Sequence, residues 1–282
     1  MYLKAEAWKK EIKLDRLVRD FDFAERDEVA SHGWSMYFHK TDRLGRPIFI
    51  QDLGNMDVTK VFQITTPERV IENFAVTLEL AVRHRYEACT VASGRWVDDN
   101  MMVVNLAGLG LGTFWSMKGQ LQQLLAILDN NFPELSGRVQ IINAPYMFST
   151  IWSWVKGWLP TATVDKIDIA GADYHDRIWQ YVNREDWPRS LGGECDCADA
   201  KGCAKSDKGP WDTRLVRTAG EKSIALEATK KRAKAMIEEA AAILDGARAE
   251  HDQLARVVGE RKEDREVECE VRLYRVDRRR VT

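Results

Sequence analysis

Three cysteines near residue 200 are the residues whose type and spacing come nearest to a reactive or metal-binding group. Cys195, Cys197 and Cys203 form a Cys-x-Cys-x5-Cys pattern in a loop rich in glycine and aspartate. A zinc site needs a fourth ligand, and zinc-binding cysteines are usually paired as Cys-x2-Cys. We therefore interpret the group as a structural thiol cluster or a weak metal site without a function. No metal and no cofactor are predicted.

A glycine-rich loop after an apolar stretch suggests a nucleotide site, but its spacing is wrong for one. Glycines occupy positions 108, 110 and 112, whereas the dinucleotide fingerprint needs a glycine at its sixth position, which here is Thr113. Hydrolase chemistry is poorly supported too, since there is no Gly-x-Ser-x-Gly sequence and the five histidines are scattered. We predict no catalytic residue and a protein that is not an enzyme, and keep a nucleotide-dependent oxidoreductase as an alternative.

Lys166 and Thr163 could together bind an anion. They occur in the sequence Thr-Val-Asp-Lys-Ile, where Lys166 begins a predicted strand whose Ile167 and Ile169 should lie in the core. A lysine at the edge of a buried sheet keeps its charge only with a partner. From the spacing alone, a solvated lysine at the end of a strand is favoured, and an anion site is the alternative.

An aromatic-rich helix is predicted directly before these residues. Its apolar side chains recur at intervals of three and four on one face, which Trp154 widens: Phe148, Ile151, Trp152, Val155, Trp158 and Leu159. The opposite face carries Ser149, Ser153, Lys156 and Gly157, and Pro160 ends the helix. So large an apolar surface has to be covered by the protein's core, a partner, a membrane surface or a bound apolar ligand.

Strand and helix patterns alternate over the first two hundred residues and predict an α/β fold. The expected strands are residues 48–53, 101–106, 139–144 and 166–170, and the expected helices are residues 67–86, 114–130 and 174–182. The run Met101–Val104 is apolar at every position, as in a strand buried on both faces. We expect a mixed, largely parallel sheet covered by helices.

Charge and hydropathy narrow the possible partners and compartments. The net charge of −2 offers no general attraction to nucleic acid. The first residues carry too many charges for a signal peptide, and no apolar run is long enough to span a membrane, so we expect a cytoplasmic protein. Residues 212–282 are rich in both signs of charge and predict a helical, partly disordered tail with a thin apolar seam of Met236, Ala240, Ile243, Ala247, Leu254 and Val258.

Several motifs together resemble the CRAL-TRIO lipid-binding family, and specifically its phosphatidylinositol/phosphatidylcholine transfer branch. The similarity rests on residues 142–150 (Ile-Asn-Ala-Pro-Tyr-Met-Phe-Ser-Thr), on the aromatic helix and on residues 163–167. Shorter matches are His-Lys-Thr-Asp-x-x-Gly-Arg-Pro at 39–47, Phe-Pro-Glu at 132–134, Leu-Gly-Gly at 191–193 and Gly-Pro-Trp at 209–211. They run in order from about Trp8 to Trp211.

The resemblance implies a deep apolar pocket that holds one phospholipid between the sheet and a mobile gating helix. The helix would be the aromatic one, with Phe148, Ile151, Trp152, Val155, Trp158 and Leu159 as its gating residues, and the floor would include Met102, Val104 and Leu106. The resemblance also implies a remnant of an N-terminal helical segment at 1–35 and a lipid-binding domain at 36–211, and the charged tail at 212–282 follows them. The predicted function is exchange of phospholipid between membranes, linked to phosphoinositide supply.

The family's inositol-phosphate site falls on Thr163, Lys166 and Glu134, so phosphatidylinositol is the expected ligand. Where the family holds phosphocholine with hydroxyl side chains, this sequence has Asn100, Met102 and Leu78. The identity of the second, apolar ligand therefore stays open. The resemblance also implies transient, peripheral association with membranes such as the Golgi or endosomes. An interaction module that senses lipid and binds a protein through residues 212–282 is the alternative.

Overall fold

The computed structural model describes residues 2–132, 135–211, 241–249 and 253, and the chain divides into two units, residues 1–214 and 215–282. In the second unit, residues 241–249 are helical and exposed. Ile243 and Ala247 of the predicted seam lie on this helix. The other seam residues, Met236, Ala240, Leu254 and Val258, lie outside the described residues, as does most of the predicted tail.

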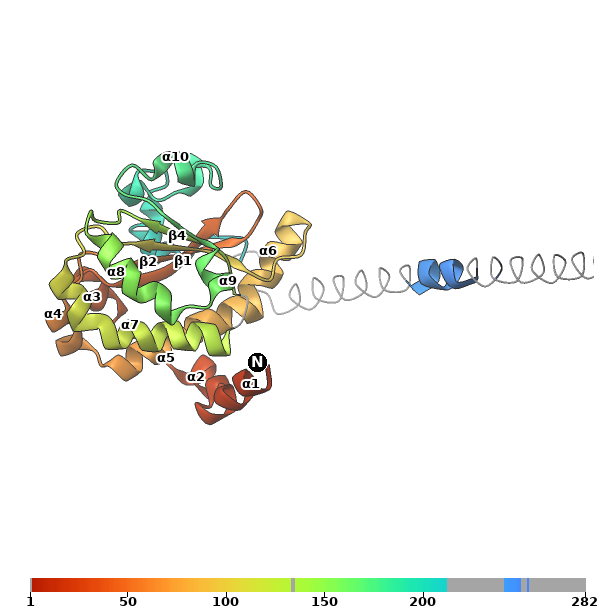
Figure 1. Cartoon of the computed structure of the whole chain (residues 1–282), viewed down its shortest axis with the longest axis horizontal. Coiled ribbons are helices and arrows are strands. Elements are labelled where there is room, and N and C mark those ends of the chain that lie inside the picture. Colours follow the sequence, from red (N-terminus) through yellow and green to blue (C-terminus); the bar gives the residue numbers. More distant parts are fainter. Residues whose placement is uncertain (1, 133–134, 212–240, 250–252, 254–282) are drawn as a thin grey trace, which may run out of the picture. The chain divides into compact units, whose positions relative to one another are not determined.

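The first unit contains a five-stranded sheet (Figure 1). Its strands are β1 (Ser35–Thr41), β2 (Pro47–Asp52), β3 (Asn100–Asn105), β4 (Ser136–Ile142) and β5 (Ile167–Ile169), and they lie side by side in that order. β1 is antiparallel to β2, and all the other neighbours are parallel. The predicted mixed, largely parallel sheet is confirmed.

The edge strand β1 is the one strand of this sheet that the sequence patterns did not predict. Its pairing with β2 is regular up to Phe38 and resumes at Thr41 after a shift in register. Between them Lys40 has a left-handed backbone, with φ of 49°. A bulge of this kind interrupts the alternation of inward and outward side chains that identifies a strand in a sequence.

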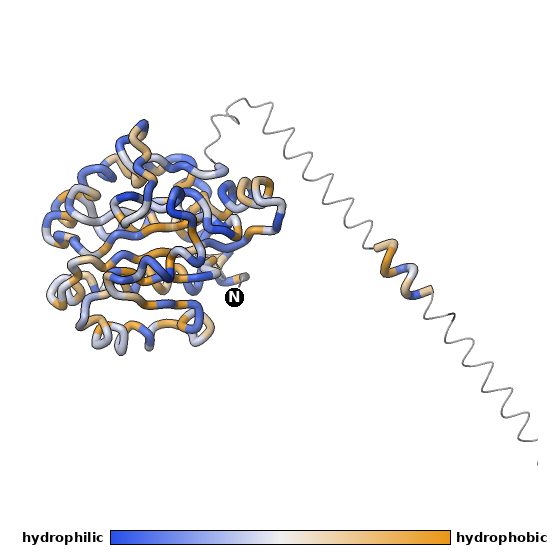
Figure 2. Tube along the Cα trace, turned by 90° about the horizontal axis from the view of Figure 1, so that it is seen from above, coloured by the Kyte–Doolittle hydropathy of each residue, from blue (hydrophilic) through white to orange (hydrophobic). Residues whose placement is uncertain are grey.

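Both faces of the sheet are buried, which explains why β2 and β3 each contain a run of consecutive apolar residues. On β2, Ile48 and Ile50 belong to one core cluster, and Phe49 between them belongs to the other. Met101 and Met102 of β3 likewise belong to different clusters. In Figure 2 hydrophobic stretches accordingly run through the middle of this unit. A parallel sheet needs such cover on both faces because its crossover connections run over them.

Helices on one face of the sheet build the larger core. They are α4 (Val58–Ile64), α5 (Pro67–Leu80), α7 (Leu111–Asn131) and α8 (Phe148–Val155), with α1 (Tyr2–Glu11), α2 (Leu14–Asp20) and α3 (Arg26–Ser31) before the sheet. α5 begins as predicted, since Thr66 caps it by accepting from the Arg69 amide at 3.3 Å and Pro67 is its first residue. The π-helical turn η1 (Ala81–Arg85) and α6 (Tyr86–Ser93) continue it.

The opposite face carries shorter elements and a smaller core. These are α10 (His175–Ile178), α11 (Cys203–Ser206) and the 3-10 turns η3 (Arg184–Asp186), η4 (Arg189–Leu191) and η5 (Ala198–Ala200). Trp187 is the largest buried side chain here, and its indole nitrogen donates to the Leu191 carbonyl at 2.7 Å.

The helix predicted over residues 174–182 is shorter in the structure, where only four of these residues form α10.

Candidate functional site

An apolar cavity of about 120 Å³ lies between the sheet and the helices α7 and α8. Among its described lining residues, only Ser136 and Thr163 are polar. A cavity lined in this way does not hold ordered water, because water needs several polar partners. The strands contribute Met102, Val104, Val139, Ile141 and Ile167, α7 contributes Phe114, Met117, Leu121, Leu125 and Leu128, and α8 contributes Phe148, Ile151, Trp152 and Val155.

The floor and the roof of this cavity contain residues that the sequence singled out. Met102, Val104 and Leu106 line it from β3 and the residue that follows. Four of the proposed gating residues line it from α8, and Leu159 lines it from the segment beyond. As the sequence pattern predicted, Ser149 and Ser153 lie exposed on the opposite face of α8.

Trp158 does not line the cavity. The α-helix ends at Val155 and continues as the 3-10 turn η2 (Lys156–Trp158), which shifts the last aromatic side chain out of phase with the others. Trp158 instead lies parallel to Phe114, with ring centroids 6.4 Å apart. The predicted helix over 148–159 is thus shorter in its α-helical part, and one of its six proposed gating residues packs against α7.

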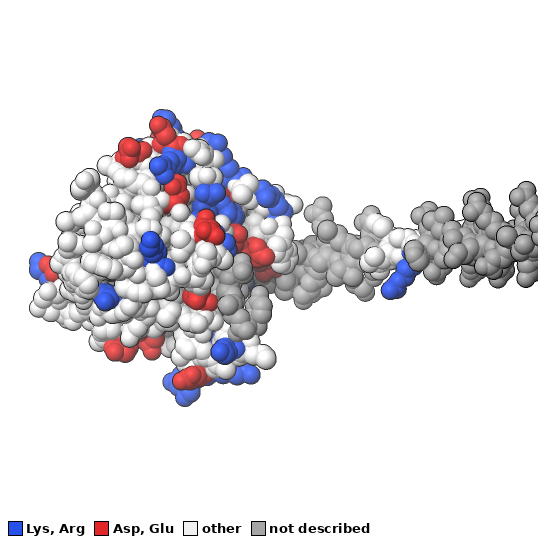
Figure 3. All heavy atoms as spheres, in the orientation of Figure 1, with Lys and Arg blue, Asp and Glu red and all other residues white. Residues whose placement is uncertain are grey.

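Exposed aromatic and apolar side chains gather on the outer surface of α7 and α8. Trp154 and Trp115 are 38% and 50% exposed, with ring centroids 5.0 Å apart. Tyr146 and Met147, directly before α8, are exposed as well. In Figure 3 the face over α7 and α8 carries few charged side chains, whereas charges gather around α10. Tryptophan and tyrosine in such positions suit the boundary between water and lipid.

A second cavity, of about 170 Å³, adjoins the first and has a more polar lining. The two share Ser136, Thr163 and three leucine side chains, Leu125, Leu128 and Leu159. Asp129 and Lys166 line only the second cavity. The two cavities together therefore have an apolar interior and a polar end. This distribution matches an amphiphilic ligand, which has a hydrocarbon part and a polar headgroup.

The structure brings Thr163 and Lys166 together at this polar end. α9 (Thr161–Val164) carries Thr163, and its carbonyl accepts from the Lys166 amide at 3.1 Å. Lys166 then leads into β5, where its carbonyl accepts from the Val139 amide at 3.0 Å. Both side chains are half-buried. Glu134, the third residue expected here, lies outside the described residues.

Three acidic or hydroxyl residues near Lys166 were missed by the sequence patterns. Asp129 and Ser136 line the polar cavity, from the end of α7 and the start of β4. Burial raises the pKa of Asp99, and the positive charges of Arg46 and Lys166 act in the opposite direction. These residues come from separate elements and follow no spacing rule, so only the folded chain shows their proximity.

The structure shows the surroundings of the three residues that the resemblance places at a phosphocholine site. Asn100 is fully buried, and its side-chain amide donates to the Tyr86 hydroxyl at 3.0 Å. Leu78 is fully buried on α5 and does not line either cavity. Met102 is part of the apolar floor. These three positions provide hydrocarbon surface and an amide whose nitrogen is hydrogen-bonded, rather than hydroxyl groups.

A hydrogen-bonded series of side chains ties the connection before α8 to the sheet. Asn143 donates to the Asn105 side-chain oxygen at 2.8 Å, and Asn105 donates to Asp52 at 2.7 Å. The three residues stand at the carboxyl ends of β4, β3 and β2. Asn143 has a left-handed backbone with φ of 53°, a conformation that asparagine tolerates better than most residues. The start of the α8 segment is therefore firmly attached.

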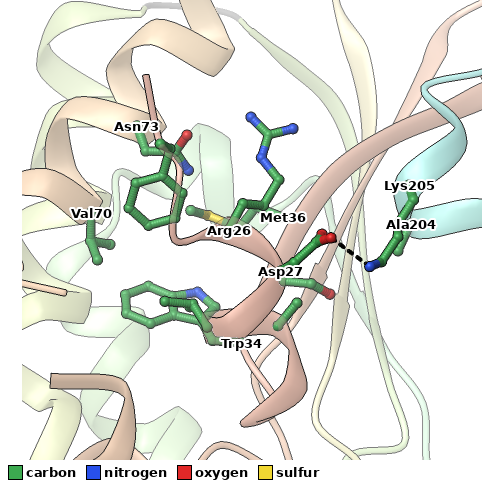
Figure 4. A pocket seen from close by; sticks show the side chains of 12 residues that line it. Arg26, Asp27, Trp34, Met36, Val70, Asn73, Ala204 and Lys205 are labelled. Carbon is green, nitrogen blue, oxygen red and sulfur yellow. Dashed lines mark hydrogen bonds and ion pairs between the residues drawn. The ribbon is translucent and has the colours of Figure 1, made fainter. Parts of the chain in front are cut away.

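A further, smaller cavity of about 60 Å³ lies between α3, β1 and α5 (Figure 4). Trp34, Met36 and Val70 line it, and the ion pair between Asp27 and Lys205, 2.7 Å long, crosses its edge. It shares no lining residue with the apolar cavity under α8. This cavity is smaller than the one under α8 and lies apart from it. We therefore take the apolar cavity under α8 as the candidate site.

Comparisons with known proteins agree with this geometry. The CRAL/TRIO domain matches residues 31–193. The Sec14 cytosolic factor of Schizosaccharomyces pombe is 36% identical over 211 residues, which are 75% of this chain and 73% of that protein. The phosphatidylinositol/phosphatidylcholine transfer protein SFH4 of Arabidopsis thaliana is 34% identical over 219 residues, which are 77% of this chain but 36% of the plant protein.

Among solved structures, the crystal structure of Sfh5 is similar with a TM-score of 0.45 and 13% identity, covering 59% of this chain and 55% of that one. This likeness is too distant to carry an argument about the site. Within the described residues, no helix is long and apolar enough to cross a membrane.

Proposed function

This chain belongs to the CRAL/TRIO domain family, and from that premise we propose that it binds a phospholipid under α8 and exchanges it between membranes. The observation that carries the proposal is the apolar cavity between α8 and the sheet, joined to a polar end at Lys166. Each buried CH2 group contributes about 0.8 kcal/mol. Only a matching apolar space can offset the removal of two acyl chains from a bilayer.

Exchange then requires α8 to move, because it forms the roof of the cavity. In the closed position seen here, α8 buries three of its own side chains toward the cavity, those of Phe148, Ile151 and Val155. In an open state the same side chains would face the bilayer, so the apolar surface is covered in both states. No covalent chemistry is needed, since ligand passes between two environments of similar affinity.

At the polar end, we propose that Thr163 and Lys166 bind the phosphate of phosphatidylinositol. The ammonium group offers three donors and a positive charge, and the hydroxyl group offers one donor. Glu134 would accept hydrogen bonds from inositol hydroxyls. The phosphocholine positions lack hydroxyl groups, and the second ligand of this site would be another apolar molecule.

The exposed aromatic side chains around α8 support a transient membrane contact. Trp115, Trp154 and Tyr146 would enter the lipid boundary while α8 opens. The protein would then act from the cytoplasm as a peripheral component of membranes such as the Golgi or endosomes, where it would supply phosphatidylinositol to phosphoinositide synthesis.

The test is to extract the purified chain with organic solvent and identify the bound lipid by mass spectrometry. We expect phospholipid at a fixed ratio to protein. A Leu121→Trp variant should contain much less, because Leu121 lines the cavity and the larger indole would fill it. Val91→Trp, at an exposed position of α6, is the matched control and should retain lipid. Equal lipid content in Leu121→Trp and the parent would contradict the proposed location.

A further inference from the structure

Four potential metal ligands converge on the face of the sheet opposite the lipid cavity. They are His39 of β1 and the three cysteines Cys195, Cys197 and Cys203. One ligand atom from each lies within 4.8 Å of the others, and the Cys195 and Cys197 sulfurs are 3.5 Å apart. His39, Cys197 and Cys203 are buried. The fourth ligand that the cysteine spacing lacks is thus supplied by a residue far earlier in the chain.

The local backbone explains how the four side chains meet. His39 lies in the irregular part of β1, between Phe38 and Thr41, and a bulge of this kind re-aims a side chain. Cys197 has a left-handed backbone with φ of 45°, and the turn η5 that follows reverses the chain. Gly202, with φ of 117°, then places Cys203 at the start of α11.

The two ring nitrogens of His39 have different surroundings. Nδ1 is 3.3 Å from the Ser206 hydroxyl, which can accept a hydrogen bond from it. Nε2 is buried, and in the part of the chain that the structure describes it has no hydrogen-bond partner. A buried polar atom without a partner is costly. An imidazole whose one nitrogen is hydrogen-bonded while the other is unpaired is the arrangement of a metal-ligating histidine.

We propose that His39, Cys195, Cys197 and Cys203 bind one zinc ion. Three thiolates and an imidazole form a tetrahedral ligand set typical of structural zinc, and soft sulfur ligands disfavour Ca²⁺ and Mg²⁺. Zn–S bonds of about 2.3 Å place tetrahedral sulfurs about 3.8 Å apart, close to the separation of Cys195 and Cys197. Four protein ligands leave no open position, so the ion would be structural and not catalytic.

The ion would attach residues 194–208 to the edge strand. Two polar links already hold this segment near its surface. The Lys40 amide of β1 donates to the Lys208 carbonyl at 2.6 Å, and Lys205 pairs with Asp27 of α3 (Figure 4). Exposed ion pairs contribute little to stability. A metal that joins β1 to the cysteine segment would be the strongest of these attachments, and it is independent of the proposed lipid site.

The experiment measures metal in the full-length protein, expressed with zinc in the medium and dialysed against metal-free buffer. We expect about one zinc ion per chain by mass spectrometry of the metal content. Replacement by Co²⁺ should give intense thiolate-to-metal absorption. Cys89→Ser is the matched control, because Cys89 is a buried free cysteine outside the cluster, and it should retain the metal.

Cys197→Ser, Cys203→Ser and His39→Gln should each weaken zinc binding by at least about tenfold. Because these variants could fail to fold, the parent protein also decides the question. A folded parent chain without stoichiometric zinc, or one whose cluster thiols form a disulfide after purification with zinc present, would overturn the proposal. A chelator should lower the thermal midpoint of the parent, and an unchanged midpoint after complete metal removal would overturn the stabilising role.

Discussion

Replacing Lys166 with alanine is the sharpest test of the polar end of the cavity. Lys166 is half-buried and lines the polar cavity next to Thr163. A hydrogen bond to a charged group contributes about 1.5–3 kcal/mol, and each 1.4 kcal/mol is about a factor of ten in affinity. The Lys166→Ala variant should therefore bind phosphatidylinositol about 10- to 100-fold more weakly.

The assay is transfer of labelled phosphatidylinositol from donor to acceptor vesicles, together with an equilibrium loading curve that gives the affinity. Lys60→Ala is the matched control, since Lys60 is an exposed lysine on α4 whose side chain pairs with Asp57. Its transfer rate should equal that of the parent. Lys166→Arg should recover part of the lost affinity, because the charge is kept while the donor geometry changes.

Stability has to be measured alongside transfer, so that loss of function is separated from loss of fold. Lys166 is not a core residue, and its replacement should change the free energy of unfolding by less than about 1 kcal/mol. If Lys166→Ala unfolds normally and transfers phosphatidylinositol at the parent rate, the assignment of the headgroup to this cavity is refuted. The apolar cavity would then still stand as a binding site, but with its ligand oriented differently.

Two further predictions concern the outer surface and the N-terminal part of the fold. Replacing both Trp115 and Trp154 with aspartate should reduce co-sedimentation with vesicles, whereas the same change at exposed Trp96 should not; equal binding by both variants would remove α7 and α8 from the membrane contact. The Arg69 guanidinium lowers the pKa of Glu25 to about 2, so the pair stabilises the fold above the ordinary pKa of 4.5 and this contribution is lost as the pH falls toward 2. Urea unfolding should show Glu25→Gln to be less stable than the parent by about 1–2 kcal/mol at pH 7, with the difference shrinking below pH 4.5.

The parts of the fold that could be predicted are those in which burial repeats along the chain. The strands β2 to β5 can be predicted as short apolar runs, and the cavity face of α8 can be predicted because its buried side chains recur at the period of a helix. Phe148, Ile151 and Val155 are an example, since three- and four-residue steps keep them on one side of an α-helix. Trp158 was misplaced because the backbone changes to a 3-10 turn, in which that period no longer holds.

Contacts between residues far apart in the chain could not be predicted in the same way. His39 lies in a bulged strand, and nothing in its neighbours points to the cysteines at 195–203. Asp129 and Ser136 reach the polar cavity from different elements, and each is unremarkable in its own segment. Thr163 and Lys166 were identified from a family resemblance, while their spacing alone favoured a solvated lysine.

The hydrogen-bonded series of Asn143, Asn105 and Asp52, at the carboxyl ends of β4, β3 and β2, determines where the proposed motion of α8 can begin. Asn143 is attached to Asn105, and Asn105 to Asp52, so the last residue before the connection is immobilised against the three central strands. A swing of α8 would then pivot beyond Asn143 and leave the strand scaffold undistorted. The floor of the cavity would keep one shape through every cycle of loading and release. The selectivity for the ligand would then depend on this floor, and α8 would set only the rate at which ligand enters and leaves.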